Sequence, residues 1–333
     1  ANCMLIYRIK SYTSQNGTTL DVDLAYQTYG CLSKEKDNAI LIPTFFGGKH
    51  TDTEYMLADG RALDIKRYFV VVVNMLGNGF SSSPSNTSSP YAGKSFPLFT
   101  LYDNVMCQHQ LVTKALRIKK LRLVTGFSMG AQQTFQWGAL FPNMVKAIAP
   151  ICGAARIADH NKVFIESAIG VLKIAPDFKA GNYKKPPLDA LNAFGHVYSA
   201  WLFSQDFFRE RLYKEIKLET AADVVKFTQN YFKQSDANDL VAMANTWANA
   251  DISANIRFNN DFDAALRAIT CKAIVLPGAT DLYFRVADSV YEVDKMSDAE
   301  LRPIPSNWGH AAGFGASSAD NIFIDKALTE LLA

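Results

Sequence analysis

Apolar residues in the first half of the chain form short runs that are separated by longer stretches of mixed polarity. Runs that are rich in β-branched residues and free of polar ones predict strands whose two faces are both covered by helices. The intervening stretches carry apolar residues at helical spacing. The expected strands are 4–9, 19–28, 39–42, 68–73, 121–125 and 147–151, and the expected helices are 52–58, 101–115 and 129–140. This alternation is typical of an α/β protein with a mostly parallel, doubly wound sheet.

The pattern changes after Cys152. From about residue 157 to 258 the sequence predicts helices without strands, at 163–174, 188–203, 207–217, 221–232 and 237–248. Helices at 261–269, 286–291 and 321–332 then alternate again with strands at 273–276 and 300–304. We therefore expect an α/β core formed by 1–155 and 258–333, with a helical insertion at 156–257. Insertions at the carboxyl ends of strands lie over the ligand crevice, so the insertion is interpreted as a lid.

Composition and charge narrow the class of protein. The chain is 49% hydrophobic and 12% aromatic, which excludes a disordered protein. Its 34 basic and 32 acidic residues give a net charge of +2, and no basic cluster predicts a nucleic-acid partner. Apolar runs such as Tyr68–Val73 are too short to span a membrane.

Five scattered cysteines, Cys3, Cys31, Cys107, Cys152 and Cys271, form no C-x-x-C pair. They predict neither a disulfide framework nor a zinc site, and we expect no metal and no cofactor. No signal peptide is recognised before the first expected strand, so a cytoplasmic location is expected.

The segment 126–130 reads G-F-S-M-G and joins an expected strand to an expected helix. This strand–turn–helix context is what the G-x-S-x-G nucleophile elbow requires. The glycines permit a tight turn, and the helix N-terminus favours a developing negative charge near the serine. Ser128 is therefore the expected nucleophile.

A serine nucleophile requires a base, and the chain has five histidines. His310 lies in a loop between the last expected strand and the terminal helix, which is where the elbow fold delivers its histidine. The other four, His50, His109, His160 and His196, are interpreted as surface or core residues.

The acid is expected between the serine and the histidine, on a loop after a strand. Asp281 follows the expected strand 273–276 and fits this position. Asp288 and Asp294 are alternatives that fall on or beyond the next helix. Asp159 is the alternative if the acid follows the preceding strand instead.

An oxyanion hole requires two preorganised backbone N–H groups. The first is expected from Met129, which follows the nucleophile, and the second from the loop after the third strand. Within that loop Phe45 is the expected donor, with Phe46 as the alternative.

Segments around these residues resemble the homoserine O-acetyltransferase family of α/β-hydrolase-fold proteins. The likeness covers nearly the whole chain and includes A-Y-Q-T-Y-G at 25–30, N-M-L-G-N-G at 74–79, S-M-G-A-Q-Q at 128–133 and T-D-L-Y-F at 280–284. It implies a triad of Ser128, Asp281 and His310, oxyanion donors Phe45 and Met129, and a homodimer packed through the inserted helices.

The resemblance ends where the family recognises homoserine. The family has an aspartate directly after the catalytic histidine and an arginine in the first inserted helix, where this chain has Ala311 and Ile169. Charge-assisted hydrogen bonds contribute about 1.5–3 kcal/mol each, so homoserine binding is not expected.

The leading hypothesis is a serine hydrolase that cleaves carboxylic esters of small to medium acyl groups through an acyl-serine. The alternative is acetyl-coenzyme A-dependent acyl transfer to a hydroxyl other than that of homoserine. A third hypothesis is a non-catalytic binding protein that retains the scaffold, because fold does not imply function.

Overall fold

A computed structural model describes residues 4–333, so Cys3 lies outside the described residues. Eight strands form one sheet in the order β1-β2-β4-β3-β5-β6-β7-β8. The strands are β1 Leu5–Thr13, β2 Thr19–Tyr29, β3 Ala39–Pro43, β4 Phe69–Val73, β5 Leu123–Phe127, β6 Ala147–Ile151, β7 Lys272–Val275 and β8 Ala299–Leu301. Strand β2 is antiparallel to β1 and to β4, whereas all pairings among strands β3 to β8 are parallel. The predicted mostly parallel sheet is confirmed.

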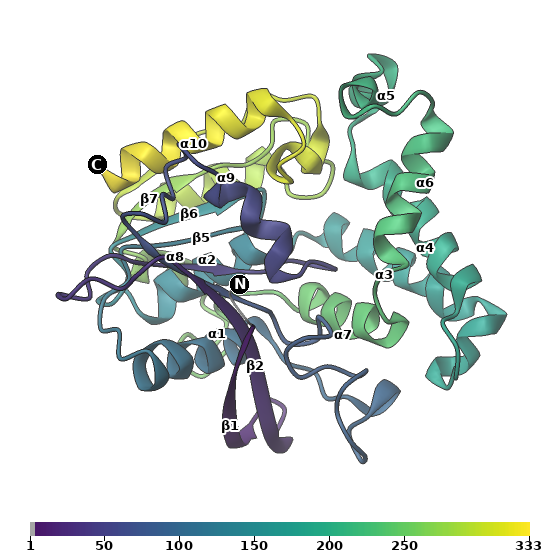
Figure 1. Cartoon of the computed structure of the whole chain (residues 1–333), viewed down its shortest axis with the longest axis horizontal. Coiled ribbons are helices and arrows are strands. Elements are labelled where there is room, and N and C mark those ends of the chain that lie inside the picture. The colour runs from purple at the N-terminus through teal and green to yellow at the C-terminus, as the bar shows by residue number, and fades with distance from the viewer. Residues whose placement is uncertain (1–3) are drawn as a thin grey trace.

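Both faces of the central strands are buried, as the unbroken apolar runs predict. In β3, Ile40 and Ile42 belong to one hydrophobic core, and Leu41 between them belongs to a second core on the opposite face. The first core also contains residues of η1 (His50–Leu57) and α10 (Ser318–Leu332). The second contains residues of α1 (Leu101–Gln110), α2 (Met129–Leu140) and α8 (Phe262–Ala268). Helices therefore cover the sheet on both sides (Figure 1).

The elements of the α/β core outside the sheet have the following bounds. They are η1 His50–Leu57, η2 Gly93–Ser95, α1 Leu101–Gln110, η3 Leu111–Ala115, α2 Met129–Leu140, α8 Phe262–Ala268, α9 Val286–Lys295, η6 Gly309–Gly313 and α10 Ser318–Leu332.

Between β6 and α8 the chain contributes helices, as the sequence predicts. They are α3 Asp159–Ile174, η4 Pro176–Gly181, α4 Leu188–Leu202, α5 Gln205–Arg209, η5 Leu212–Ile216, α6 Ala221–Phe232 and α7 Ala237–Ala248. Figure 1 shows α3, α4, α5 and α6 gathered at one end of the molecule, beyond the sheet. Within residues 4–333, no helix combines the length and apolar composition that crossing a bilayer requires.

Three expected helices differ from the structure. The expected helix 207–217 is two short pieces, α5 and η5, because Arg211 has a left-handed φ of 53°. The expected helix 52–58 is a 3₁₀ helix, in which the Thr53 hydroxyl donates to the His50 carbonyl and competes with α-helical bonding. The expected helix 101–115 ends in a π-helical turn.

A buried carboxyl group joins the two parts of the α/β core. Oε2 of Glu292, on α9, accepts a hydrogen bond of 2.7 Å from the N–H of Ala155, which precedes the inserted helices. Glu292 is 2% exposed, and burial raises the pKa of its carboxyl group to about 8. The folded protein therefore holds a proton on Glu292 at pH values where the unfolded chain has lost it.

This proton makes the stability of the fold depend on pH. Between the unfolded pKa of about 4.3 and the folded value, the free energy of unfolding should fall as pH rises, by at most about 1.4 kcal/mol per pH unit. In Glu292→Gln this slope should be absent. The free energy of unfolding of the variant should therefore rise relative to that of the unmodified protein as the pH increases from 5 to 8. Urea unfolding at several pH values measures the difference. Asp294→Asn, an exposed change on the same helix, is the control; a constant difference for Glu292→Gln would contradict the account.

Candidate active site

Ser128 lies at the turn between β5 and α2, as the elbow motif predicts. Its φ of 60° and ψ of −119° are unfavourable for an L-residue, and its side chain does not cap the helix. Backbone strain of this kind is a feature of the nucleophile elbow, in which the turn exposes the serine Oγ. The hydroxyl is therefore free to bond elsewhere.

The two glycines of the motif are required by close approach of the backbone. A Cβ on Gly126 would lie 2.6 Å from the carbonyl carbon and oxygen of Gly130. A Cβ on Gly130 would lie 2.6 Å from the carbonyl oxygen of Pro43, at the end of β3. The start of α2 thus packs directly against the strand that leads into the 43–48 loop.

His310 joins the serine and the aspartate. In η6, its Nε2 lies 2.9 Å from Ser128 Oγ and its Nδ1 lies 2.7 Å from Asp281 Oδ2. A carboxylate only accepts, so Nδ1 of the neutral ring carries the proton and Nε2 accepts from the serine hydroxyl. The imidazole is 2% exposed and the Asp281 side chain is fully buried. The structure therefore brings together the three residues that the sequence predicts as a triad.

Both carboxylate oxygens of Asp281 have partners. Oδ1 accepts hydrogen bonds of 3.1 Å from the N–H groups of Tyr283 and Phe284, which leaves Oδ2 for His310. The backbone thus fixes the orientation of the carboxylate. The alternative acids lie on other elements, Asp288 and Asp294 on α9 and Asp159 at the start of α3.

A threonine joins the loop of the acid to the loop of the histidine. Thr280 Oγ1 donates to the Ser306 carbonyl at 2.8 Å and accepts from the Gly309 N–H at 3.0 Å. The bond from Gly309 connects the residue that precedes His310 with the residue that precedes Asp281. No local pattern in the sequence predicts this role of Thr280, because its partners lie more than twenty residues away.

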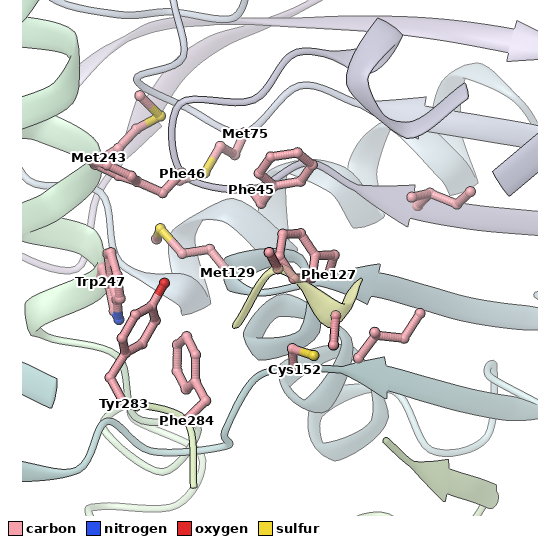
Figure 2. Packing of buried hydrophobic residues seen from close by; sticks show 14 of the residues in the cluster. Phe45, Phe46, Met75, Phe127, Met129, Cys152, Met243, Trp247, Tyr283 and Phe284 are labelled. Carbon is pink, nitrogen blue, oxygen red and sulfur yellow. The ribbon is translucent and has the colours of Figure 1, made fainter. Parts of the chain in front are cut away.

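Aromatic rings surround the imidazole. The ring of His310 stacks on Phe127 at 4.7 Å between centroids and lies 4.6 Å from Tyr283 and 5.4 Å from Phe284. Figure 2 shows Tyr283 and Phe284 side by side near Trp247, and Phe127 next to Phe45. Such surroundings restrict water and strengthen the hydrogen bonds of the site.

The other histidines have different surroundings. Nδ1 of His50 pairs with the Asn74 amide at 3.1 Å, and His109 stacks on Phe141 at 3.9 Å. His160 packs near Trp201, and His196 is exposed. These contacts agree with their interpretation as surface or core residues.

A small cavity adjoins Ser128 and His310, with a volume of about 30 Å³. The 43–48 loop lines one part of it, and α4 and α6 line another. Within residues 4–333, no Lys, Arg, Asp or Glu lines it. The lining residues are Phe45, Phe46, Phe127, Ser128, Tyr198, Leu202, Phe227, Thr228, Tyr231, Phe232, His310 and Phe314.

The inserted helices supply much of this lining, and the sequence identified little of it. Two aromatic residues of the insertion, Phe207 and Trp247, are fully buried in its core. Tyr231 and Phe232 line the cavity. Tyr198 was not predicted, because helical periodicity does not show which buried face lies over a distant strand end.

The positions that differ from the homoserine-specific family are apolar and buried. Ala311 is 1% exposed and Ile169 is 6% exposed, and both belong to the core on the insertion side of the sheet. Neither supplies a charge for an amino-acid substrate.

Comparison with known proteins places the chain in a family. Residues 40–316 match the family model described as alpha/beta hydrolase fold. The chain is 37% identical to an ethyl acetate hydrolase of Pseudomonas veronii over 93% of this chain and 89% of that protein. The crystal structure of an acetylester hydrolase from Corynebacterium glutamicum has a TM-score of 0.96 and 33% identity, covering 99% of this chain and 96% of that one.

The expected likeness to homoserine O-acetyltransferases is also confirmed. The chain is 29% identical to the enzyme of Trichormus variabilis, over 89% of this chain and 85% of that protein. With the matched family model and the sheet order of the structure, these relationships show that the chain belongs to the α/β hydrolase family.

Proposed function

We propose that the protein is a serine esterase that hydrolyses carboxylic esters of small acyl groups through an acyl-Ser128 intermediate. The observation that carries the proposal is the continuous hydrogen-bond chain from Ser128 through His310 to Asp281, next to an apolar cavity. The relationship to an ethyl acetate hydrolase and an acetylester hydrolase supports the same reaction.

Acylation begins when Ser128 Oγ attacks the ester carbonyl carbon. Nε2 of His310 takes the hydroxyl proton, and Asp281 stabilises the resulting imidazolium without taking the proton. The carbonyl oxygen becomes an oxyanion, which receives hydrogen bonds from the N–H groups of Phe45 and Met129. Collapse of the intermediate expels the alcohol, which takes the proton from His310.

Deacylation repeats these steps with water as the nucleophile. His310 takes a proton from water, the hydroxide adds to the acyl carbon, and the second oxyanion occupies the same two N–H groups. Collapse releases the carboxylic acid and returns the proton to Ser128.

The described residues that line the cavity carry no charged side chain, which favours water over a zwitterionic acceptor such as homoserine. A buried zwitterion without partners would cost several kcal/mol. Ala311 and Ile169 offer no such partner.

The triad should act as a unit. Ser128→Ala and His310→Ala should each lower the turnover of an acetyl ester by about four to six powers of ten, and the double variant should lose little more. Asp281→Asn should lose less, about four powers of ten, because it favours the wrong imidazole tautomer. Hydrolysis of p-nitrophenyl acetate measures these rates. Asp159→Asn is the control; a large loss there, or additive losses in the double variant, would contradict the assignment.

The cavity should select short acyl groups. Its 30 Å³ has room for about two water molecules, since one requires about 10–15 Å³. We expect kcat/KM for acetyl esters to exceed that for octanoyl esters by at least about tenfold. Leu202→Ala should reduce this ratio, and Leu212→Ala, which shortens a half-buried leucine away from the cavity, should not. Equal rates for both esters in the unmodified protein would contradict this selectivity.

We further propose that the protein is cytoplasmic and that two copies associate through the inserted helices. The four described cysteines are unpaired, which is typical of a reducing compartment.

Val163 and Ile174 on α3 and Leu188 on α4 are more than half exposed, which supports a partner surface there. Sedimentation equilibrium should give twice the chain mass of 36.8 kDa; the monomer mass at micromolar concentration would contradict the dimer.

A further inference from the structure

Thr44, whose carbonyl forms the peptide bond with Phe45, is held by hydrogen bonds at three of its atoms. The Thr44 N–H donates to the Val73 carbonyl at 3.1 Å, and Thr44 Oγ1 accepts from the Met75 N–H at 2.9 Å. The Thr44 carbonyl accepts a hydrogen bond of 3.0 Å from Nε2 of Gln133. The last contact fixes one side of the peptide plane that contains the Phe45 N–H.

In a trans peptide the carbonyl and the N–H point in opposite directions. The bond between Thr44 and Phe45 is trans, because the cis peptide of the described chain lies at Ser89-Pro90. The hydrogen bond from Gln133 therefore directs the Phe45 N–H away from the side-chain amide of Gln133. Within residues 4–333, this N–H has no acceptor in the protein, and Phe45 lines the cavity beside Ser128.

Gln133 is itself oriented by two further buried side chains. Nε2 of Gln108 donates to Oε1 of Gln133 at 2.7 Å, and Oε1 of Gln108 accepts from Nε1 of Trp137 at 2.7 Å. All three side chains are fully buried. They form a chain of hydrogen bonds that leads from α2 through α1 and back to the loop after β3.

The donors and acceptors in this series of hydrogen bonds can be assigned in only one way. The indole N–H of Trp137 only donates, so the atom of Gln108 that faces it must be the oxygen. The amide nitrogen of Gln108 then faces Gln133, whose oxygen must accept. The amide nitrogen of Gln133 is left to donate to the carbonyls of Thr44 and Met129, at 3.0 and 3.1 Å.

We propose that Gln133, oriented by Gln108 and Trp137, is a positioning residue for the oxyanion hole. It holds the Thr44–Phe45 peptide so that the Phe45 N–H faces the oxyanion that forms on acyl transfer to Ser128. The inference rests on the proposed esterase function and assigns a role to three side chains that take no part in the triad. Within the described residues, the bond from Gln133 is the hydrogen bond that holds this peptide group, so its loss leaves the Thr44 carbonyl without a partner.

Gln133→Met tests this role, because methionine is of similar length and cannot donate a hydrogen bond. Removing an oxyanion donor outright lowers kcat by about two to three powers of ten, so loosening one donor should lower kcat by about 10- to 100-fold. KM for a neutral acetyl ester should change less than threefold, because the ground-state carbonyl depends little on the hole. Gln136→Met, a fully buried change on α2 whose amide donates to the Ile252 carbonyl, is the matched control and should keep kcat.

A second readout reports on the oxyanion itself. An alkyl trifluoromethyl ketone adds to a serine hydroxyl: the Oγ–carbon bond forms, the proton passes to His310, and the carbonyl electrons become an oxyanion. The inhibition constant for this ketone should rise in Gln133→Met by the same factor by which kcat/KM falls. A residue that acts only on stability would lower the melting temperature without this proportionality.

Gln108→Met is the second variant, in case Gln133→Met does not fold. This variant keeps the Gln133 amide that donates to Thr44 but removes the hydrogen bond from Gln108 that orients it. We therefore expect kcat to fall by about 3- to 10-fold, and the affinity for the ketone to fall by the same factor. If both variants fold and their kcat and ketone inhibition stay within twofold of the unmodified protein, the inference is overturned. If the unmodified protein hydrolyses no ester, the proposed function fails instead, so the two failures are distinguishable.

Discussion

The hydrogen bond between Ser128 and His310 is the interaction on which the rest of the site depends. It joins atoms of residues separated by 182 positions, so it exists only because the sheet places the ends of distant strands together. Ser128 reaches it from a strained backbone with a φ of 60°. Such strain persists only where the surroundings determine the conformation, and here the Ser128 N–H donates to the Ile151 carbonyl of the neighbouring strand at 2.9 Å.

Hydrogen bonds also hold the groups that surround Ser128, His310 and Asp281. Backbone N–H groups hold Asp281, Thr280 joins its loop to that of His310, and Gln133 holds the peptide that precedes Phe45. Each contact positions a group before substrate arrives, which is how preorganised sites lower the reorganisation required during the reaction. The cavity, by contrast, is lined in large part by α4 and α6 of the insertion, and the proposed acyl selectivity depends on these two helices.

The sequence was sufficient for the sheet, the insertion and the residues brought together at Ser128, because each carries a local signal. Apolar runs mark the buried strands, and G-x-S-x-G marks the turn. Other features depend on contacts across the fold. The break at Arg211 follows from a single left-handed residue, and Thr280 and Tyr198 have partners or neighbours far away in the chain. No pattern of spacing predicts that Trp137 sets the direction of two glutamine amides.

The central claim is that an acyl group is transferred to Ser128 during turnover. Its most direct test is rapid quenching of the protein with p-nitrophenyl acetate in the first turnover, followed by proteolysis and mass spectrometry. The account predicts an acetyl group on Ser128, in an amount equal to the burst of p-nitrophenol, which then decays to acetate. A burst with the acetyl group on another residue, or steady hydrolysis in Ser128→Ala at the unmodified rate, would contradict it.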